Sequence, residues 1–424
     1  MNIGFEQTHI GRQPILDRNR SLYAFELLFR GGTNADSSGS TSSDDSNDTA
    51  TVISNAFNEL GAEAILGPCR GFVNLNESIL MDEVIELLPK SKIVFEIMKT
   101  VQITYKVMER CRQLRSAGYR LALDNVTDLE DKRIDMIEHI NIIKINITHF
   151  AHNELSLLVD KIKSKNKTIT LLAERVETQE QFNQCLKVGF DLFQGYFFAK
   201  PRVIDGKRMP HSKLTLLKVL EQLMSDAQMH IIEKSIKENP DLSINLLRIA
   251  SSVGVGSTKN ISSISDAITI LGRRQLQRWV QLLIYTNTEI GKDGQLSPLL
   301  LLAASRGRVM ELIAQEKKDI HFENHAFVTG ILSLIDALFG ISINDALSQI
   351  KLNLSVTNAL LKREGELGEL LQFIELAEQE NNEEEIKWRI QKFPYLTTEK
   401  FKKLYAESFM WSIAASQGAM AAPQ

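Results

Sequence analysis

The chain has 424 residues, which is more than one ordinary hydrophobic core accommodates, so two domains are expected. Hydrophobic residues make up 43% of it and charged residues 24%, a balance that is typical of soluble globular proteins. The net charge of −4 gives no sign of a nucleic-acid-binding surface, and no apolar run is long enough to span a bilayer.

The N-terminal segment and the cysteines indicate a cytoplasmic protein. The first ten residues, MNIGFEQTHI, lack the basic and then apolar layout of a signal peptide. Cys69, Cys111 and Cys185 are widely spaced and form no CxxC pair. Ordinary buried thiols in a reducing compartment are therefore expected. No membrane partner is expected, because no apolar run is long enough to span a bilayer.

From residue 8 to about 200, short β-type runs alternate with amphipathic helical stretches. Helices are predicted over 49–60, which ends before Gly61, and over 101–118, which ends in Gly118. Repeated strand–helix units favour a parallel sheet, and the predicted fold is an α/β, TIM-like (β/α) barrel. The β-type runs are 22–29, 71–76, 92–97, 119–125, 141–146 and 168–174.

One segment interrupts this pattern. Residues 31–50, GGTNADSSGSTSSDDSNDTA, consist almost wholly of Ser, Asp, Asn, Thr and Gly. Such a segment cannot bury apolar surface, so a disordered loop is predicted above the C-terminal end of the second strand. A tolerated insertion is favoured over a modifiable or partner-binding lid.

The character of the chain changes near residue 210. The barrel domain is assigned to 1–205, and a linker to 206–212 within the stretch RVIDGKRMPH. From Leu214 onward the chain is leucine-rich and helical, which predicts an all-α domain over 213–405 and a C-terminal tail over 406–424. The acidic stretch 375–388 is interpreted as a solvated helix face and turn.

Polar residues stand at the C-terminal ends of successive β-type runs. In a barrel of this kind the catalytic face is the C-terminal rim of the strands. A single polar residue there is usually a solvated strand end, and it is the set that favours a functional site. Its members are Glu26, Asn74, Glu96, Asp124, Lys144, Glu174 and Gln194.

The same segments resemble the EAL domain, the family of cyclic-di-GMP phosphodiesterases. The resemblance covers about residues 5 to 202, and several family motifs occur in the right order. The matches are E-x-L-x-R as Glu26-Leu27-Leu28-Phe29-Arg30, N-x-S as Asn74-Leu75-Asn76, A-E-G-V-E as Ala173-Glu174-Arg175-Val176-Glu177, and Q-G-Y…P as Gln194-Gly195-Tyr196…Pro201.

The resemblance implies a role for each matched residue. Glu174 and Lys144 match the groups that orient and deprotonate the attacking water, Gln194 matches a support residue, and Arg30 matches a contact to a substrate phosphate. An all-oxygen ligand set suits Mg²⁺ or Mn²⁺, the metals of this family. The positions that match the first metal's ligands are Glu26, Asn74, Glu96 and Asp124.

The departures from the family pattern decide the interpretation. Active members carry D-D-F-G-T-G where this chain has Asp124-Asn125-Val126-Thr127-Asp128-Leu129, so a carboxylate ligand of the second metal is replaced by Asn125. An anchoring Glu is replaced by Lys99, the aspartate of K-x-D by Asn146, and the glycine of A-E-G-V-E by Arg175. Hydrolysis of this kind uses two ions, and the changes leave a second cation poorly neutralised.

The hypothesis is a site that binds at most one Mg²⁺ or Mn²⁺, or none, and whose catalysis is lost or severely impaired. Substitution of the lost ligand by Asp128 is the alternative, although Asp128 lies in a different loop register. Whether cyclic-di-GMP binds is a separate question. Arg30 and the one-metal ligand set permit binding, whereas the altered loop and Arg175 argue against tight binding.

The second half resembles the HDOD family, a modified HD hydrolase fold, over about 212 to 405. The matching segments are NPDLSINLLRIASSVG (239–254) and ISSISDAITILGRRQLQRWVQLL (261–283). No His-Asp dipeptide exists in the chain, and His321 and His325 lack a clear third ligand, so a helix start with a surface histidine is favoured over a metal site. Trp279 is interpreted as a core residue of an amphipathic helix.

An EAL domain followed by an HDOD domain occurs in bacterial signalling proteins. The resemblance implies a regulator in cyclic-di-GMP pathways that control motility and biofilm formation, with a degenerate barrel and a helical domain that docks protein partners. Two alternatives stay open: an active or weakly active phosphodiesterase, and a receptor that binds cyclic-di-GMP without turnover.

Overall fold

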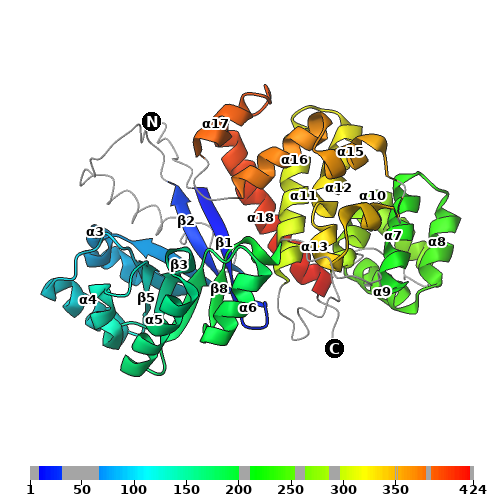
Figure 1. The fold of residues 1–424 in the computed structure, drawn as a ribbon. Coiled ribbons are helices and arrows are strands. Elements are labelled where there is room, and N and C mark those ends of the chain that lie inside the picture. The colour runs from blue at the N-terminus through cyan, green and yellow to red at the C-terminus, as the bar shows by residue number, and fades with distance from the viewer. Residues whose placement is uncertain are drawn as a thin grey trace. The chain divides into compact units, whose positions relative to one another are not determined.

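The computed structural model describes residues 9–30, 66–199, 211–253, 263–285, 297–348, 350, 352–378 and 383–420. The chain divides into two compact units, residues 1–200 and 201–424, and each is described by itself (Figure 1). The predicted loop at 31–50, the predicted helix at 49–60 and residues 206–210 of the predicted linker lie outside the described residues.

The first unit is a closed barrel of eight strands, which confirms the predicted fold. Strand β1 is antiparallel to both β2 and β8, and the other neighbours are parallel, so the sheet is not wholly parallel as the sequence suggested. The turn between β1 and β2 spans only residues 18–21, which is too short for the crossover that a parallel pair needs. The strands are β1 (His9–Asp17), β2 (Leu22–Arg30), β3 (Arg70–Leu75), β4 (Ile93–Ile97), β5 (Arg120–Val126), β6 (Ile142–Asn146), β7 (Thr170–Glu174) and β8 (Leu192–Gln194).

Helices and short 3₁₀ turns connect the strands of the barrel. The predicted helix over 101–118 is α4, which begins after Thr104, whose side chain accepts a hydrogen bond from the Val107 amide. The three cysteines are buried free thiols, as predicted. The connecting elements are α3 (Glu77–Met81), η1 (Glu83–Leu87), α4 (Tyr105–Ser116), η2 (Lys132–His139), η3 (Ile147–His149), α5 (His152–Lys165), α6 (Gln179–Val188) and η4 (Tyr196–Phe198).

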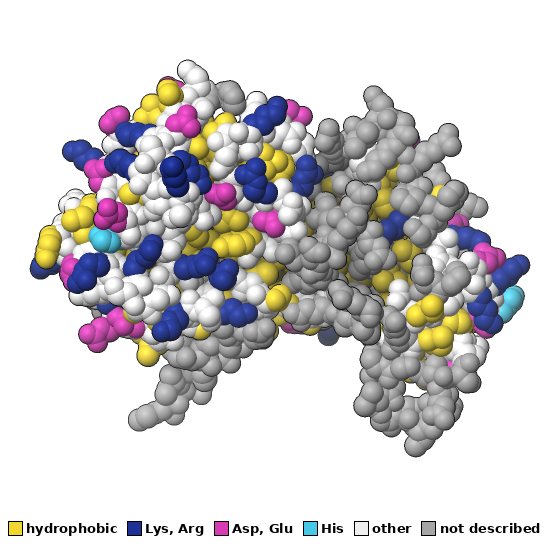
Figure 2. Space-filling view, turned by 90° about the horizontal axis from the view of Figure 1, so that it is seen from below, with side chains coloured by type: hydrophobic (Ala, Val, Ile, Leu, Met, Phe, Trp, Pro, Cys, Tyr) yellow, Lys and Arg dark blue, Asp and Glu magenta, His cyan; other side chains and the backbone are white. Residues whose placement is uncertain are grey.

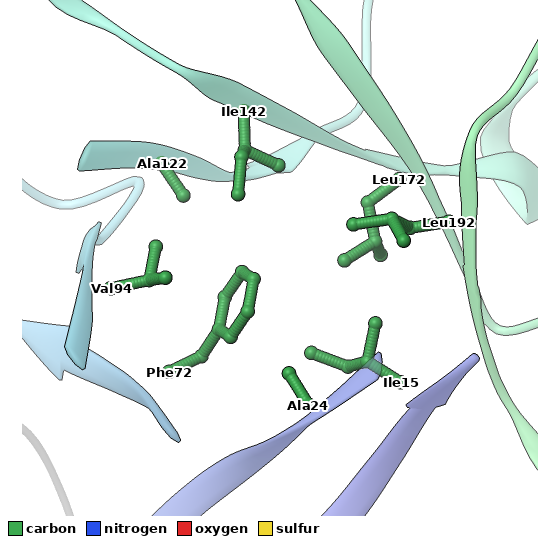
Figure 3. Close-up of a cluster of buried hydrophobic side chains, with 8 residues drawn as sticks. All are labelled: Ile15, Ala24, Phe72, Val94, Ala122, Ile142, Leu172 and Leu192. Atoms are coloured by element: carbon green, nitrogen blue, oxygen red, sulfur yellow. The ribbon is translucent and has the colours of Figure 1, made fainter. Parts of the chain in front are cut away.

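A layer of apolar side chains fills the barrel, with one residue from each strand (Figure 3). Because side chains alternate between the two faces of a strand, the residue two positions further along each parallel strand points inward at the next level. The apolar layer therefore lies directly beneath the next layer of inward-pointing side chains. Its members are Ile15, Ala24, Phe72, Val94, Ala122, Ile142, Leu172 and Leu192.

Lys and Arg side chains of the barrel unit, on the left in Figure 2, are interspersed with acidic and apolar ones. Several of these cations bind backbone carbonyls at the ends of helices, where a positive charge is favourable. Lys90 Nζ donates to the Ala117 carbonyl at 3.2 Å, and Arg115 Nη1 donates to the Ile140 carbonyl at 3.0 Å. None of the described helices is both long and apolar enough to cross a membrane.

The described part of the second unit is helical, as predicted. Trp279 is buried, which confirms its interpretation as a core residue. His321 is exposed in the first turn of α12, where Asp319 caps the helix. The helices are α7 (His211–Met224), α8 (Met229–Lys237), α9 (Pro240–Val253), α10 (Ile264–Tyr285), α11 (Pro298–Gln315), α12 (Ile320–Leu332), α13 (Ile335–Phe339), α14 (Ile343–Leu347), α15 (Leu354–Lys362), α16 (Gly365–Ala377), α17 (Glu383–Ile390) and α18 (Thr398–Met420).

The structure differs from the predicted C-terminal tail over 406–424. Helix α18 continues through residue 420 and packs along α11. Ser408, Ser412 and Ser416 on α18 are fully buried, and the Ser408 hydroxyl lies 3.2 Å from that of Ser305 on α11. The buried side chains of 408–416 are Ser408, Ser412, Ile413 and Ser416, mostly small and polar, so the sequence carries little periodic hydrophobic signal for this face.

Candidate functional site

A polar layer stands directly above the apolar layer of the barrel. On β2 to β8 each member lies two positions beyond the apolar residue of the same strand, as Glu26 does beyond Ala24. On β1, which runs the other way, it lies two positions before Ile15, and it pairs in register with Glu26. The eight members are Gln13, Glu26, Asn74, Glu96, Asp124, Lys144, Glu174 and Gln194.

The structure thus brings together all seven polar residues that the sequence placed at strand ends. The eighth, Gln13, was not predicted, because it does not stand at a C-terminal strand end: β1 runs in the opposite direction to the other strands. Gln194 Nε2 donates to Gln13 Oε1 and, at 2.6 Å, to Glu26 Oε2. Gln13 therefore takes part in the same hydrogen-bond network as the predicted residues.

The ammonium group of Lys144 lies in the middle of this layer and is fully buried. Its Nζ atom is 2.8 Å from Glu96 Oε1 and 2.9 Å from Glu26 Oε2. It is also 3.2 Å from Glu174 Oε1 and 3.3 Å from Asp124 Oδ1. One cation thus holds carboxylates from four strands, which makes Lys144 the central charge of the site.

The carboxyl groups differ in their pKa because burial and charge act on them unequally. Burial, together with the nearby Glu26 charge, raises the pKa of Glu96 well above its usual range. Burial also raises the pKa of Glu174, to about 7, although Lys144 opposes the shift. Burial acts in the same direction on Glu26, but the Lys144 charge and the hydrogen bond from Gln194 prevail and lower its pKa.

The pKa of Lys144 is raised despite its burial. Removal from water disfavours the charged form of the amine, but the surrounding carboxylates, with Glu174 and Glu26 foremost, outweigh that effect. Lys144 is therefore an ammonium ion at neutral pH. Burial brings the pKa of Glu174, by contrast, to about 7, so this carboxyl exchanges a proton close to neutral pH.

The oxygens of this layer have the chemistry of ligands for a hard divalent cation. Five buried oxygen atoms have no hydrogen bond among the described residues, and one of them, Glu96 Oε1, is held only by its ion pair with Lys144. Among the described residues, however, no three His, Cys, Asp or Glu side chains already converge in a way that would hold an ion. The carboxylate and amide oxygens of the layer fit such a cation, while the Lys144 ammonium lies at the centre of these oxygens. The five atoms are Asn74 Oδ1, both carboxylate oxygens of Glu96, Glu174 Oε2 and Gln194 Oε1.

The end of β5 carries the residue that the sequence singled out as a lost metal ligand. Asn125 adopts a left-handed backbone conformation with φ of +50°. Its side-chain oxygen accepts a hydrogen bond of 3.4 Å from Asn146 Nδ2, and Asn146 Oδ1 in turn accepts from the Thr148 hydroxyl at 2.8 Å. The two replaced carboxylates are therefore neighbours, joined as a pair of neutral amides.

The remaining predicted positions lie around this pair. Lys99 is exposed, and its ammonium donates to the Thr127 hydroxyl in the loop after β5. Asp128 is exposed, and its carboxylate accepts a hydrogen bond from the Glu130 backbone amide at 3.0 Å. This bond stabilises the loop that contains Asp128. Arg175 is exposed, with φ of +57° where the family has glycine.

Arg30 is the last residue of β2, and its side chain lies outside the described residues. The structure therefore gives the position of its backbone at the rim of the barrel. The predicted contact to a substrate phosphate stays a prediction.

Comparisons with known proteins agree with the fold and the motifs. The model of the EAL domain matches residues 12–201, and the model of the HDOD domain matches residues 208–367. A solved structure of Klebsiella pneumoniae BlrP1, a manganese and cyclic-di-GMP complex, has a TM-score of 0.38 and 21% identity. That match covers 46% of this chain and 56% of BlrP1, so the chain spans little more than half of that protein's length.

Two curated relatives match nearly the whole chain. The chain is 27% identical over 378 residues to the uncharacterized protein YuxH of Bacillus subtilis, covering 88% of this chain and 91% of YuxH. It is 30% identical over 375 residues to the cyclic di-GMP phosphodiesterase CdgJ of Vibrio cholerae, covering 88% of this chain and 85% of CdgJ. The chain therefore belongs to the EAL family of cyclic-di-GMP signalling proteins, with an EAL domain followed by an HDOD domain.

Proposed function

We propose that this protein is a regulator in cyclic-di-GMP-linked control of motility or biofilm formation, and that its barrel is a degenerate phosphodiesterase. The helical domain, residues 213–405 with the rest of α18, is proposed to dock protein partners. Family membership supports the pathway. The neutral amides Asn125 and Asn146 at the second-metal positions support the loss of catalysis.

The hydrogen bond between Asn125 and Asn146 is the observation that carries this proposal. Phosphodiester hydrolysis with two ions needs negative charge on both sides of the metal pair. Two neutral amides bonded to each other supply no negative charge, and the nearby Lys99 adds a positive one. A second cation is therefore disfavoured at this side of the rim.

The first-metal positions are proposed to hold a single cation at most. If Mg²⁺ or Mn²⁺ binds, Glu26, Asn74, Glu96 and Asp124 would hold it, and it would polarise a phosphate oxygen. Glu174, whose pKa is raised to about 7 by burial, can accept a proton from water, and Lys144 holds its carboxylate at 3.2 Å. Gln194 fixes Glu26 through a bond of 2.6 Å.

The proposal is tested by restoring the lost charge. The double variant Asn125→Asp/Asn146→Asp should acquire Mg²⁺- or Mn²⁺-dependent hydrolysis of cyclic-di-GMP that the parent protein lacks. Asn166→Asp, in the loop before β7, is a matched control that adds an acidic charge away from the rim. If the double variant stays inactive, the loss of the second-metal ligands does not by itself explain the degeneracy, and the loop or Arg175 must contribute.

A second candidate is an active phosphodiesterase, and one observation favours it. Every residue that the resemblance assigns to the first metal and to water activation lies in one polar layer, around Lys144. The relative CdgJ is named a cyclic di-GMP phosphodiesterase. Hydrolysis by the unmodified protein would favour this candidate over the degenerate barrel.

A further inference from the structure

The ladder between β5 and β6 is irregular at the rim of the barrel. Leu123 pairs with Ile143 and Val126 pairs with Ile145, so β5 has one residue more than β6 over this interval. The extra residue forms a β-bulge that contains Asp124 and Asn125. Bulges of this kind re-aim side chains next to functional sites, and they interrupt the regular hydrogen bonds of the backbone.

A buried arginine binds the backbone of this bulge. Arg133, in η2, donates from Nη1 to the Asp124 carbonyl at 2.8 Å and from Nη2 to the Asn125 carbonyl at 3.2 Å. Backbone carbonyl groups in a partly buried position are normally paired, because an unpaired one costs free energy. The guanidinium group thus supplies donors where the ladder is irregular.

Asp131 holds Arg133 in this position. Arg133 Nε lies 3.0 Å from Asp131 Oδ1, and Nη2 lies 2.6 Å from Oδ2, in a two-pronged ion pair. Both side chains are 7% exposed, so the pair is shielded from solvent and salt. The Asp131 carboxylate also accepts from the Arg133 amide at 2.9 Å, which closes the loop onto itself.

We propose that the Arg133–Asp131 pair is the positioning device of the candidate site: it fixes the bulge and so keeps the Asp124 carboxylate beside Lys144. Only the planar fork of arginine can reach two carbonyls and a carboxylate at once. The paired charges cancel, so the device adds little charge to the carboxylates. This inference rests on the proposed function for the identity of the ligand, and on the contacts alone for the geometry.

The test compares Arg133→Gln with Arg110→Gln. Arg110, on α4, has the same kinds of partner away from the rim: the Leu80 and Asp82 carbonyls at 3.0 Å each and the Glu86 carboxylate at 2.6 Å. Amide hydrogen exchange of the full chain gives the first readout. Arg133→Gln should speed exchange in peptides that cover 120–131, whereas Arg110→Gln should speed it in peptides that cover 80–88.

Binding of Mn²⁺ followed by electron paramagnetic resonance gives the second readout. Groups that orient metal ligands typically contribute about tenfold or more to affinity, so Arg133→Gln should weaken Mn²⁺ binding by about tenfold, with Arg110→Gln near the parent value. Arg133→Lys, which can bind one carbonyl, should fall between them. Equal weakening by both Gln variants would indicate a general loss of stability and contradict a positioning role.

The two readouts separate this inference from the proposed function. If the parent protein binds no Mn²⁺, the one-metal part of the proposed function fails, and hydrogen exchange alone decides the role of Arg133. Unchanged exchange over 120–131 in Arg133→Gln overturns the inference in either case. If Arg133→Gln does not fold, Asp131→Asn keeps the arginine but loosens its anchor, and the same exchange pattern is expected at smaller amplitude.

Discussion

At the scale of single residues, the site is an electrostatic balance around one lysine. Four carboxylates within 3.3 Å of Lys144 Nζ would repel each other strongly without it, because the layer is removed from water. Glu26 also accepts hydrogen bonds from Gln194 and Asn74, which add a smaller contribution. Lys144 is therefore a structural counter-ion in addition to any role in chemistry.

Lys144→Met should destabilise the barrel strongly at pH 8. Removing one partner of a buried ion pair typically costs about 3–5 kcal/mol, which lowers Tm by roughly 10 °C in a domain of this size. The loss should shrink at pH 5, because the abandoned carboxylates then bind protons. Scanning calorimetry of the full chain measures both values.

Lys163→Met is the matched control for this experiment. Lys163 binds the Ile169 carbonyl and Asp191, but its side chain is 30% exposed. Such partly solvated pairs contribute about 1 kcal/mol or less. A Tm at pH 8 that is equally low in both variants would contradict the central place of Lys144.

Glu174→Gln should change the pH dependence of stability. The pKa of Glu174 is raised from 4.5 to about 7 by burial, so between these values the folded state binds more protons than the unfolded state. This carboxyl therefore makes the parent protein lose stability as pH rises from 4.5 to 7, by at most about 3 kcal/mol. The variant lacks this contribution.

Relative to the parent, Glu174→Gln should be more stable at pH 8 than at pH 5. Denaturant titrations of both proteins at the two pH values measure the difference. A constant difference between parent and variant across this range would show that Glu174 keeps an ordinary pKa in the fold.

How far the site could be predicted is seen in the same residues. Glu26, Glu96 and Lys144 could be found because each follows an apolar run at a strand end, and the barrel rule brings such ends together. Gln13 could not be found, because the direction of β1 in the barrel depends on tertiary structure and is not given by the sequence pattern. Arg133 could not either, since a single arginine in a 3₁₀ turn has no periodic signal that predicts burial.

At the scale of elements, the segments that follow β7 and β8 meet at the rim of the barrel, next to the polar layer. The Val176 amide donates to the Gln194 carbonyl at 3.0 Å, and the Phe197 amide donates to the Val176 carbonyl at 3.2 Å. Gly195 lies between them with φ of +143°, where other residues are strained. The close approach of the two backbones thus depends on a missing side chain.

Gly195→Ala should therefore disturb both stability and the site. An added Cβ would lie 2.1 Å from the Val176 carbonyl oxygen, so the backbone must move, at a typical cost of about 1–3 kcal/mol beyond the conformational strain. The shift would carry Gln194 away from Glu26. Thermal unfolding of the full chain measures the loss of stability.

Gly118→Ala is the matched control, because Gly118 also has a positive φ, of +96°, but its nearest neighbour is the flexible Lys90 side chain at 3.6 Å. Only conformational strain of about 1–2 kcal/mol is expected there. If the two substitutions lower Tm equally, the close approach at Val176 does not limit the structure.

The elements themselves were predictable to different degrees. Alternating and continuous apolar runs located β2 to β7, because buried strands need such side chains. The antiparallel direction of β1 was not predicted, and the short turn after the strand explains it. The extent of α18 was not predicted because the buried face of its C-terminal part is mostly serine, which contributes close packing rather than hydrophobicity.

At the scale of the whole molecule, two units with separate cores are joined in one chain. The barrel unit contains the complete polar layer within its own strands. In the helical unit one cluster of charged side chains is paired internally: the buried Glu311 is paired with Arg274, Arg278 and Arg308. Under the function proposed above, the barrel would keep the architecture of an enzyme and the helical unit would dock protein partners.

The most direct test of the degenerate barrel is hydrolysis of cyclic-di-GMP by the purified full chain with Mg²⁺ or Mn²⁺, beside Glu26→Ala as the control. Our account predicts no turnover above that of the control, which would leave a scaffold or a receptor. Titration with the nucleotide then separates these two, because a receptor gives a saturable signal that Arg30→Ala abolishes. Turnover that disappears in Glu26→Ala would contradict the account and identify a working phosphodiesterase.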